Sequence, residues 1–118
     1  LTEEWNKVCS TELVQGVVIA RKSFVNEHPE AIEQFLREYE KSSAFVNENI
    51  DEAAKLIVDA GILGNVEIAK KAIPNCNISF SKGEAMHKAV EGMLTVLFEA
   101  NPKSIGGKLP DKDFYYGI

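Results

Sequence analysis

"ELVQGVVIAR", residues 12–21, is the stretch that decides the fold of this chain. Its apolar residues follow one another instead of alternating with polar ones, and Val14, Val17 and Val18 are β-branched. Branched side chains suit a pleated surface, and a continuous apolar run is typical of a strand that is buried on both faces. The segment therefore predicts a strand inside a mixed sheet, most of whose other strands lie outside this chain.

Helical signals fill most of the remaining sequence. Pro29 suits a first helical position, and the apolar residues after it recur every three or four positions, which predicts a helix over residues 29–47. Asn49 is a candidate cap for a second helix that ends at Gly61, and Asn65 is a candidate cap for a third that stops at Pro74.

Two further segments complete the predicted order of elements. "NCNISF", residues 75–80, alternates polar and apolar side chains and predicts a short strand. "SKGE", residues 81–84, has the pattern of a capping box and predicts the start of a long helix that ends at Asn101. Two strands cannot form a stable sheet alone, so either the fold is mostly helical or these strands complete a sheet whose other strands lie outside this chain. The continuous apolar run favours the second, and the expected fold class is α/β and helix-dominated, with few strands and about four helices.

The end of the chain, "SIGGKLPDKDFYYGI" (104–118), holds three adjacent aromatic residues. Disordered tails rarely carry such residues because they cannot bury them. Gly106 and Gly107 permit turns, and Pro110 holds the backbone extended. We expect a strap whose aromatic side chains pack on the body of the protein.

The composition limits the classes of function. The 118 residues suit one domain, and the net charge of −5 with no basic stripe argues against nucleic-acid binding. No apolar run approaches the roughly 20 residues of a membrane span. The start at Leu1 predicts a piece of a longer protein, with any export signal upstream.

The two cysteines leave two alternatives open. Cys9 and Cys76 either form a disulfide or remain separate thiols.

Long segments of the chain resemble the solute-binding proteins of ABC importers of the nitrate, sulfonate and thiamine-precursor type. The likeness runs from about residue 12 to 116, through "VVIARKSFVNEHPEAIEQFLREYEKSSAFVNENIDEAAKLIV" and the ending "GGKLPDKDFYY". The positions that carry it are Arg21, Lys22, Phe24, Pro29, Glu30, Ala31, Phe35, Leu36, Tyr39, Ser42, Asn49, Ala53, Ala54, Ala72, Ile73, Pro74, Cys76, Asn77, Ile78, Gly106, Gly107, Leu109, Pro110, Phe114 and Tyr115.

The resemblance implies a type II periplasmic-binding fold with two lobes, of which residues 1–118 would be a carboxy-terminal segment and partial lobe. It implies a non-enzymatic component that captures a small solute by lobe closure and delivers it to a membrane permease. The solute would be nitrate, a sulfonate, a taurine-like compound or a pyrimidine. The location would be extracytoplasmic, in the periplasm or as a cell-surface lipoprotein.

Ligand-binding candidates are the polar residues at the ends of the predicted strands. Ser10, Thr11 and Gln15 flank or occupy the first, and Asn75 begins the second. Their alternative role is to finish turns and to satisfy backbone groups.

Other roles have weaker support. His28 and His87 are isolated, so we expect no metal, no cofactor and no catalytic residue, although fungal thiamine-pyrimidine synthases provide an enzyme relative of this fold. The rival to a transport role is a stand-alone helical interaction or regulatory domain folded from residues 29–101. An incomplete lobe would also expose apolar surface, which favours a homodimer or strand exchange.

Overall fold

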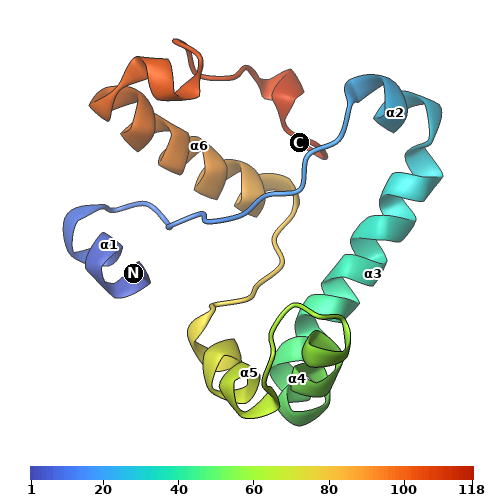
Figure 1. Ribbon diagram of the computed structural model, residues 1–118. Helices are drawn as coiled ribbons and strands as arrows, with labels where there is room; N and C mark the ends of the chain where they lie inside the picture. Colours follow the sequence, from blue (N-terminus) through green and yellow to red (C-terminus); the bar gives the residue numbers. More distant parts are fainter. The chain divides into compact units, whose positions relative to one another are not determined.

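The computed structural model describes residues 1–118 and contains six α-helices and no strand (Figure 1). The helices are α1 (Thr2–Val8), α2 (Lys22–Glu27), α3 (Pro29–Glu48), α4 (Ile50–Asp59), α5 (Val66–Ala72) and α6 (Gly83–Ala100). Short 3-10 turns are η1 (Ile73–Asn75), η2 (Pro102–Ile105) and η3 (Lys112–Phe114). The predicted helix over residues 29–47 is confirmed as α3, and the long helix ending at Asn101 is confirmed as α6.

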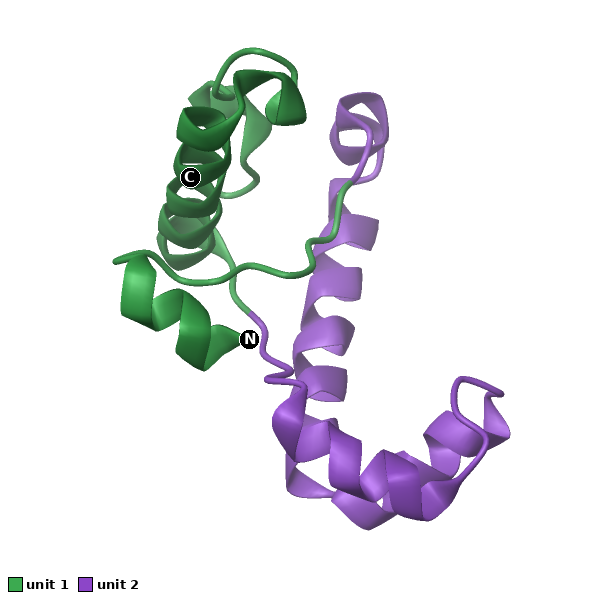
Figure 2. Ribbon diagram, turned by 60° about the vertical axis from the view of Figure 1, so that its left-hand side comes forward, with its two compact units in different colours: residues 1–19, 81–118 green, residues 20–80 purple.

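The chain divides into two compact units, coloured separately in Figure 2. Unit 1 combines Leu1–Ile19 with Ser81–Ile118, so it contains α1, α6 and the terminal strap. Unit 2 is Ala20–Phe80 and contains α2 to α5. The helical rival predicted one bundle over residues 29–101, but α3 to α5 and α6 fall in different units.

The core of unit 2 is small and built on alanine. Ala53 and Ala54 of α4 and Ala69 of α5 are buried together with Ile73, and the half-buried residues packed against them are Phe45, Val46, Ile50, Ile57 and Val66. Small side chains let α4 and α5 approach closely. A salt bridge of 3.0 Å from Lys70 Nζ to Asp51 Oδ1 also joins these helices, and this hydrogen bond is the main cause of a raised pKa at Lys70.

The two predicted asparagine caps behave differently. Asn65 Oδ1 accepts a hydrogen bond of 3.1 Å from the backbone N–H of Ile68, which confirms it as the side-chain cap of α5. Asn49 occupies the cap position of α4, but its side chain makes no cap hydrogen bond and instead donates to the carbonyl of Phe45 at 3.3 Å. The capping box at residues 81–84 is also wrong, because the cap of α6 is Lys82 without a side-chain cap bond.

Helix α4 ends in a Schellman motif. Gly61 has φ of +73°, its N–H donates to the carbonyl of Val58 at 2.9 Å, and the N–H of Ile62 donates to the carbonyl of Ile57 at 3.0 Å. These are the two backbone bonds that define the motif. The left-handed glycine predicted at position 61 is therefore confirmed, and the backbone around Ile62 is fixed.

The strap of unit 1 buries one of its three aromatic residues. Tyr115 is 8% exposed, whereas Phe114 and Tyr116 remain at the surface. The ring of Tyr115 lies edge-on to the ring of His87 on α6, with 4.4 Å between their centroids. Of the three aromatic residues in the predicted strap, Tyr115 is therefore the one that is buried.

The decisive prediction of a buried strand over residues 12–21 is wrong. Residues 12–20 form no regular secondary structure and make no hydrogen bond, and residue 21 is the cap of α2. Val17, Val18 and Ile19 are 60%, 51% and 82% exposed. A strand needs neighbouring strands to satisfy its backbone, and no other segment of this chain supplies one.

The second predicted strand is wrong for the same reason. Of residues 75–80, Asn75 belongs to η1, Cys76 and Asn77 form a turn, and residues 78–80 are irregular. The protein is therefore helical, and the predicted α/β class with its partial periplasmic-binding lobe does not hold.

Candidate functional site

Three of the four predicted ligand-binding residues lie in unit 1. Ser10 and Gln15 are exposed, and neither makes a hydrogen bond. Thr11 is half-buried, and its carbonyl accepts a hydrogen bond of 2.6 Å from Nε1 of Trp5. The hydroxyl of Thr11 is buried without a hydrogen-bond partner. Thr11 therefore packs as part of the unit, whereas Gln15 is free to meet a ligand.

Asn75, the fourth predicted residue, lies in unit 2. Its side-chain amide donates to the carbonyl of Lys71 at 2.9 Å, one turn back along the chain. This bond satisfies a carbonyl at the end of α5, which is the turn-finishing role considered for it. The four predicted residues are thus divided between two compact units.

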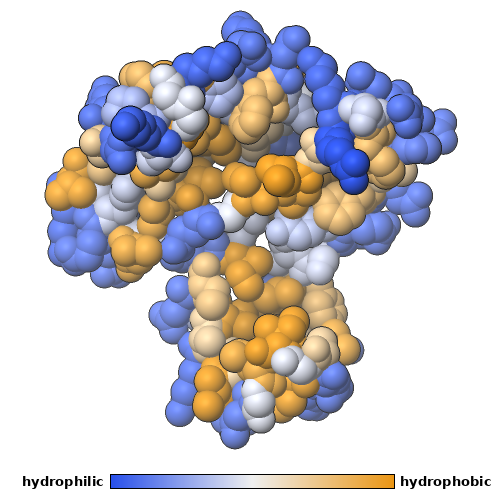
Figure 3. Space-filling model, turned by 45° about the horizontal axis from the view of Figure 1, so that its top comes forward, coloured by the Kyte–Doolittle hydropathy of each residue, from blue (hydrophilic) through white to orange (hydrophobic).

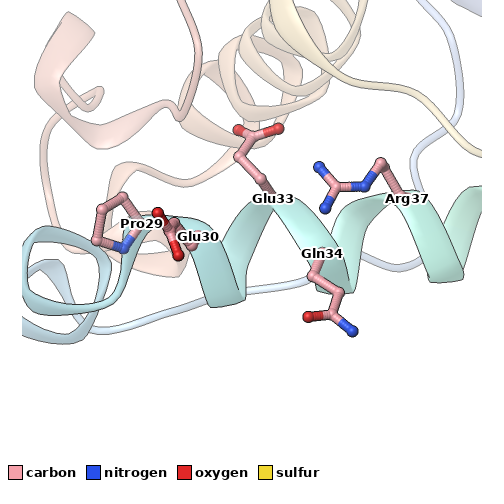
Figure 4. A pocket seen from close by; sticks show the side chains of 5 residues that line it. All are labelled: Pro29, Glu30, Glu33, Gln34 and Arg37. Carbon is pink, nitrogen blue, oxygen red and sulfur yellow. The ribbon is translucent and has the colours of Figure 1, made fainter.

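A shallow hollow runs along the first turns of α3. It is lined by Pro29, Glu30, Glu33, Gln34 and Arg37, all from this one helix (Figure 4). Figure 4 shows Glu33 and Arg37 on one side of the helix and Gln34 on the other. Since a single helix supplies every lining residue, the hollow does not enclose a ligand between two elements.

A cluster of ionisable groups lies on α6 in unit 1. The His87 ring has Nδ1 3.8 Å from Glu84 Oε2 and Nε2 3.8 Å from Glu91 Oε1. The His87 side chain is 14% exposed, so it is mostly buried on α6. Sequence reasoning missed this cluster, although the i, i+3 and i, i+4 spacing around His87 contained the signal.

The strap completes that cluster. Burial, and secondly the negative charge of Glu91, raise the pKa of Tyr115 above its usual value of 10.0. The Tyr115 hydroxyl is buried and has no hydrogen-bond partner. Together these observations describe a packing contact that holds the strap on α6.

Large apolar side chains are exposed in both units. In unit 1 they include Val17, Val18 and Ile19 of the segment 12–20. In unit 2 they include Leu56, Ile62, Leu63 and Ile68, which belong to α4, α5 and the turn between them. Figure 3 shows apolar side chains at the surface of the molecule, including the region of α4 and α5.

The remaining observations concern the cysteines, His28, metal ligands and membrane-spanning helices. Cys9 and Cys76 are both free thiols. His28 is exposed and packs on the Phe24 ring with 4.8 Å between centroids. No group of three or more His, Cys, Asp or Glu residues is arranged to hold a metal ion, and no helix is both long enough and apolar enough to cross a membrane.

No protein family, curated protein or solved structure matches this chain.

Proposed function

We propose that this chain is a non-enzymatic part of the solute-binding component of an ABC importer. In this role the component acts outside the cytoplasm, closes around a small solute and delivers it to the membrane permease. Closure of this kind needs no covalent chemistry, because solute contacts made only in the closed state shift the equilibrium toward it. The sequence resemblance over residues 12–116 supports the proposal.

The structural observation that carries the proposal is the state of segment 12–20. Val17, Val18 and Ile19 are exposed, and the backbone of the segment makes no hydrogen bond. Burial of a large aliphatic side chain stabilises a protein by about 1.5–3 kcal/mol relative to leaving that side chain in water. The segment is therefore suited to be covered by another polypeptide body.

The test is a thermal-shift screen of the protein that carries this chain against nitrate, taurine, an aliphatic sulfonate and a pyrimidine, with chloride at matched ionic strength as the control. A true solute at 100 times its Kd adds about 2.7 kcal/mol to the free energy of unfolding. One of these classes is expected to raise the melting temperature, and chloride is not. If none does so at millimolar concentration, the transport proposal fails.

Two matched variants examine the predicted site within the same screen. Gln15→Ala removes an exposed side chain that makes no hydrogen bond, so the ligand-free melting temperature should be unchanged while the solute-induced shift is lost. Asn75→Ala removes a side chain that already satisfies the Lys71 carbonyl, so it should lower the ligand-free stability instead. Equal loss of the shift in both variants would assign Asn75 to the ligand as well.

The second candidate function is a helical interaction or regulatory domain. The specific observations that favour it are the absence of any strand and the exposed apolar residues of α4 and α5. Such a domain would bind a protein and no small solute. A solute-dependent shift in the screen above would exclude it.

A further inference from the structure

A three-residue segment near the end of unit 2 has the pattern Asn-x-Ser. It consists of Asn77, Ile78 and Ser79, and no other asparagine of the chain is followed by Ser or Thr two positions later. Where the middle residue is not proline, this pattern is the acceptor for N-linked glycosylation. The pattern has this meaning only in a surface loop that another protein can reach, so its place in the fold is decisive.

The structure places this segment at the surface and outside every helix. Asn77 lies in the turn after η1, and residues 78–80 are irregular. Asn77 and Ser79 are both exposed, whereas Ile78 between them is half-buried, and its carbonyl accepts a hydrogen bond of 2.9 Å from Nδ2 of Asn47. A modifying enzyme can therefore bind the amide and the hydroxyl without breaking the hydrogen bonds of a helix.

The backbone gives a separate reason for asparagine at position 77. Asn77 has φ of +50°, in the left-handed region that asparagine and aspartate tolerate better than most residues. Asn77→Asp therefore suits the same turn while it removes the acceptor amide. The turn places no demand on Ser79, which is exposed and follows it. The requirements of the turn and of the acceptor pattern can thus be tested separately.

We propose that Asn77 is an N-glycosylation site of the protein that carries this chain. The inference rests on the extracytoplasmic location in the proposed function, because N-linked glycans belong to exported proteins. The donor is an oligosaccharide joined through pyrophosphate to a membrane lipid. Nδ2 of Asn77 attacks C1 of the first sugar, the N–C1 bond forms, and the bond from C1 to the pyrophosphate oxygen breaks. The lipid pyrophosphate leaves, and one amide proton passes to a base of the transferase.

The first measurement is mass spectrometry of the protein isolated from the cells that make it. After alkylation of the cysteines and digestion with trypsin, residues 72–82 form one peptide, which contains Asn75 and Asn77. We expect a glycan on Asn77, located by fragmentation of the peptide. Asn75 is the internal control and should carry none, because the residue two positions later is Asn77.

The second measurement uses the purified, folded chain with an oligosaccharyltransferase and a lipid-pyrophosphate-linked oligosaccharide. Wild type and Ser79→Thr should each gain the mass of one oligosaccharide, whereas Ser79→Ala and Asn77→Asp should gain none. Ser79 is exposed, so both of its variants should keep the wild-type melting temperature. Ser81→Ala changes an exposed serine outside the pattern and is the matched control, which should be modified like wild type.

Several results would overturn the proposal. One is a native protein in which the peptide of residues 72–82 is unmodified. Another is a folded chain that the transferase leaves bare while it modifies a synthetic peptide of the same residues, because the fold then hides the acceptor. A glycan that persists in Ser79→Ala would show that the pattern is not what the enzyme reads.

The outcome is distinguishable from failure of the transport proposal. A glycan on Asn77 without any solute-induced shift would contradict transport and retain the extracytoplasmic location. A solute-induced shift in a protein whose Asn77 is bare would contradict the glycosylation site alone.

Discussion

The side chain of Thr11 occupies the space that a β-carbon on Gly92 would need. An ideal Cβ built on Gly92 lies 2.8 Å from Cγ2 and 3.0 Å from Cβ of Thr11. Gly92 is in the middle of α6, where glycine costs about 1 kcal/mol relative to alanine. The close approach of the segment after α1 to α6 explains why glycine is present there.

This contact predicts the outcome of Gly92→Ala. Overpacking against a β-branched residue costs about 1–3 kcal/mol, which exceeds the gain in helix propensity, so the variant should be less stable than wild type by up to ~2 kcal/mol. In a Thr11→Ala background the nearest methyl group is gone, and the same change should be milder or stabilising. Urea unfolding of the four proteins in this cycle measures the difference, and simple additivity would refute the contact.

The buried Tyr115 hydroxyl leads to the prediction that one substitution, Tyr115→Phe, stabilises the protein. It is buried without a hydrogen-bond partner, so Tyr115→Phe removes an unsatisfied polar group and should raise the free energy of unfolding by about 1 kcal/mol. Tyr115→Ala removes the ring that holds the strap on α6 and should lower the free energy of unfolding by about 3 kcal/mol. Phe114→Ala, at an exposed ring, is the control for general damage to the strap and should cost less. A destabilised Tyr115→Phe would show that the hydroxyl is satisfied.

The same residue predicts a pH dependence at alkaline pH. Burial, and then the charge of Glu91, raise the folded-state pKa of Tyr115 above 10.0, so the folded state favours the neutral phenol. This contribution to stability is complete below the unfolded-state pKa and is lost as the pH rises from about 10 through the raised pKa. Wild type should therefore lose stability over this range more steeply than Tyr115→Phe. Ultraviolet absorbance of tyrosinate gives the pKa itself, and identical pH profiles for both proteins would contradict the shift.

The two asparagine caps predict unequal losses. Asn65→Ala removes a cap hydrogen bond to the N–H of Ile68 and should lower the free energy of unfolding by about 1 kcal/mol. Asn49→Ala removes a longer bond to a carbonyl of the preceding helix and should cost about half as much or less. Chemical denaturation measures the free energy of unfolding of both variants. A larger loss for Asn49→Ala would mean that it caps α4 after all.

The sequence predicted α3, α4, α5 and α6 because their signals are local, whereas the short helices α1 and α2 were not predicted. Pro29 at the start of α3, Gly61 after α4, Asn65 before α5 and Asn101 after α6 each act within one turn of their own position. The error at residues 12–21 has the opposite cause. Branched apolar side chains favour a β-strand, but a strand forms only where other strands pair with the segment.

The candidate site was less predictable because it depends on contacts between residues far apart in the sequence. Ser10, Thr11, Gln15 and Asn75 were chosen because they would lie at strand ends, and no strand forms. The cluster around His87 depends on the strap returning to α6, a contact between residues far apart in sequence. The exposed side chain of Ile62 was also not predictable, because the residue after a Schellman glycine usually contacts its own helix.

The most direct test of this account concerns the backbone amides of Leu13 to Ala20, since the corrected helical fold depends on their being unpaired. Hydrogen exchange of the full chain, followed by NMR, measures each of them. These amides should exchange nearly as fast as in an unstructured peptide while those of α3 and α6 are protected. Strong protection of alternate residues from 13 to 20 would mean that the segment is paired as a strand, and the account would be wrong.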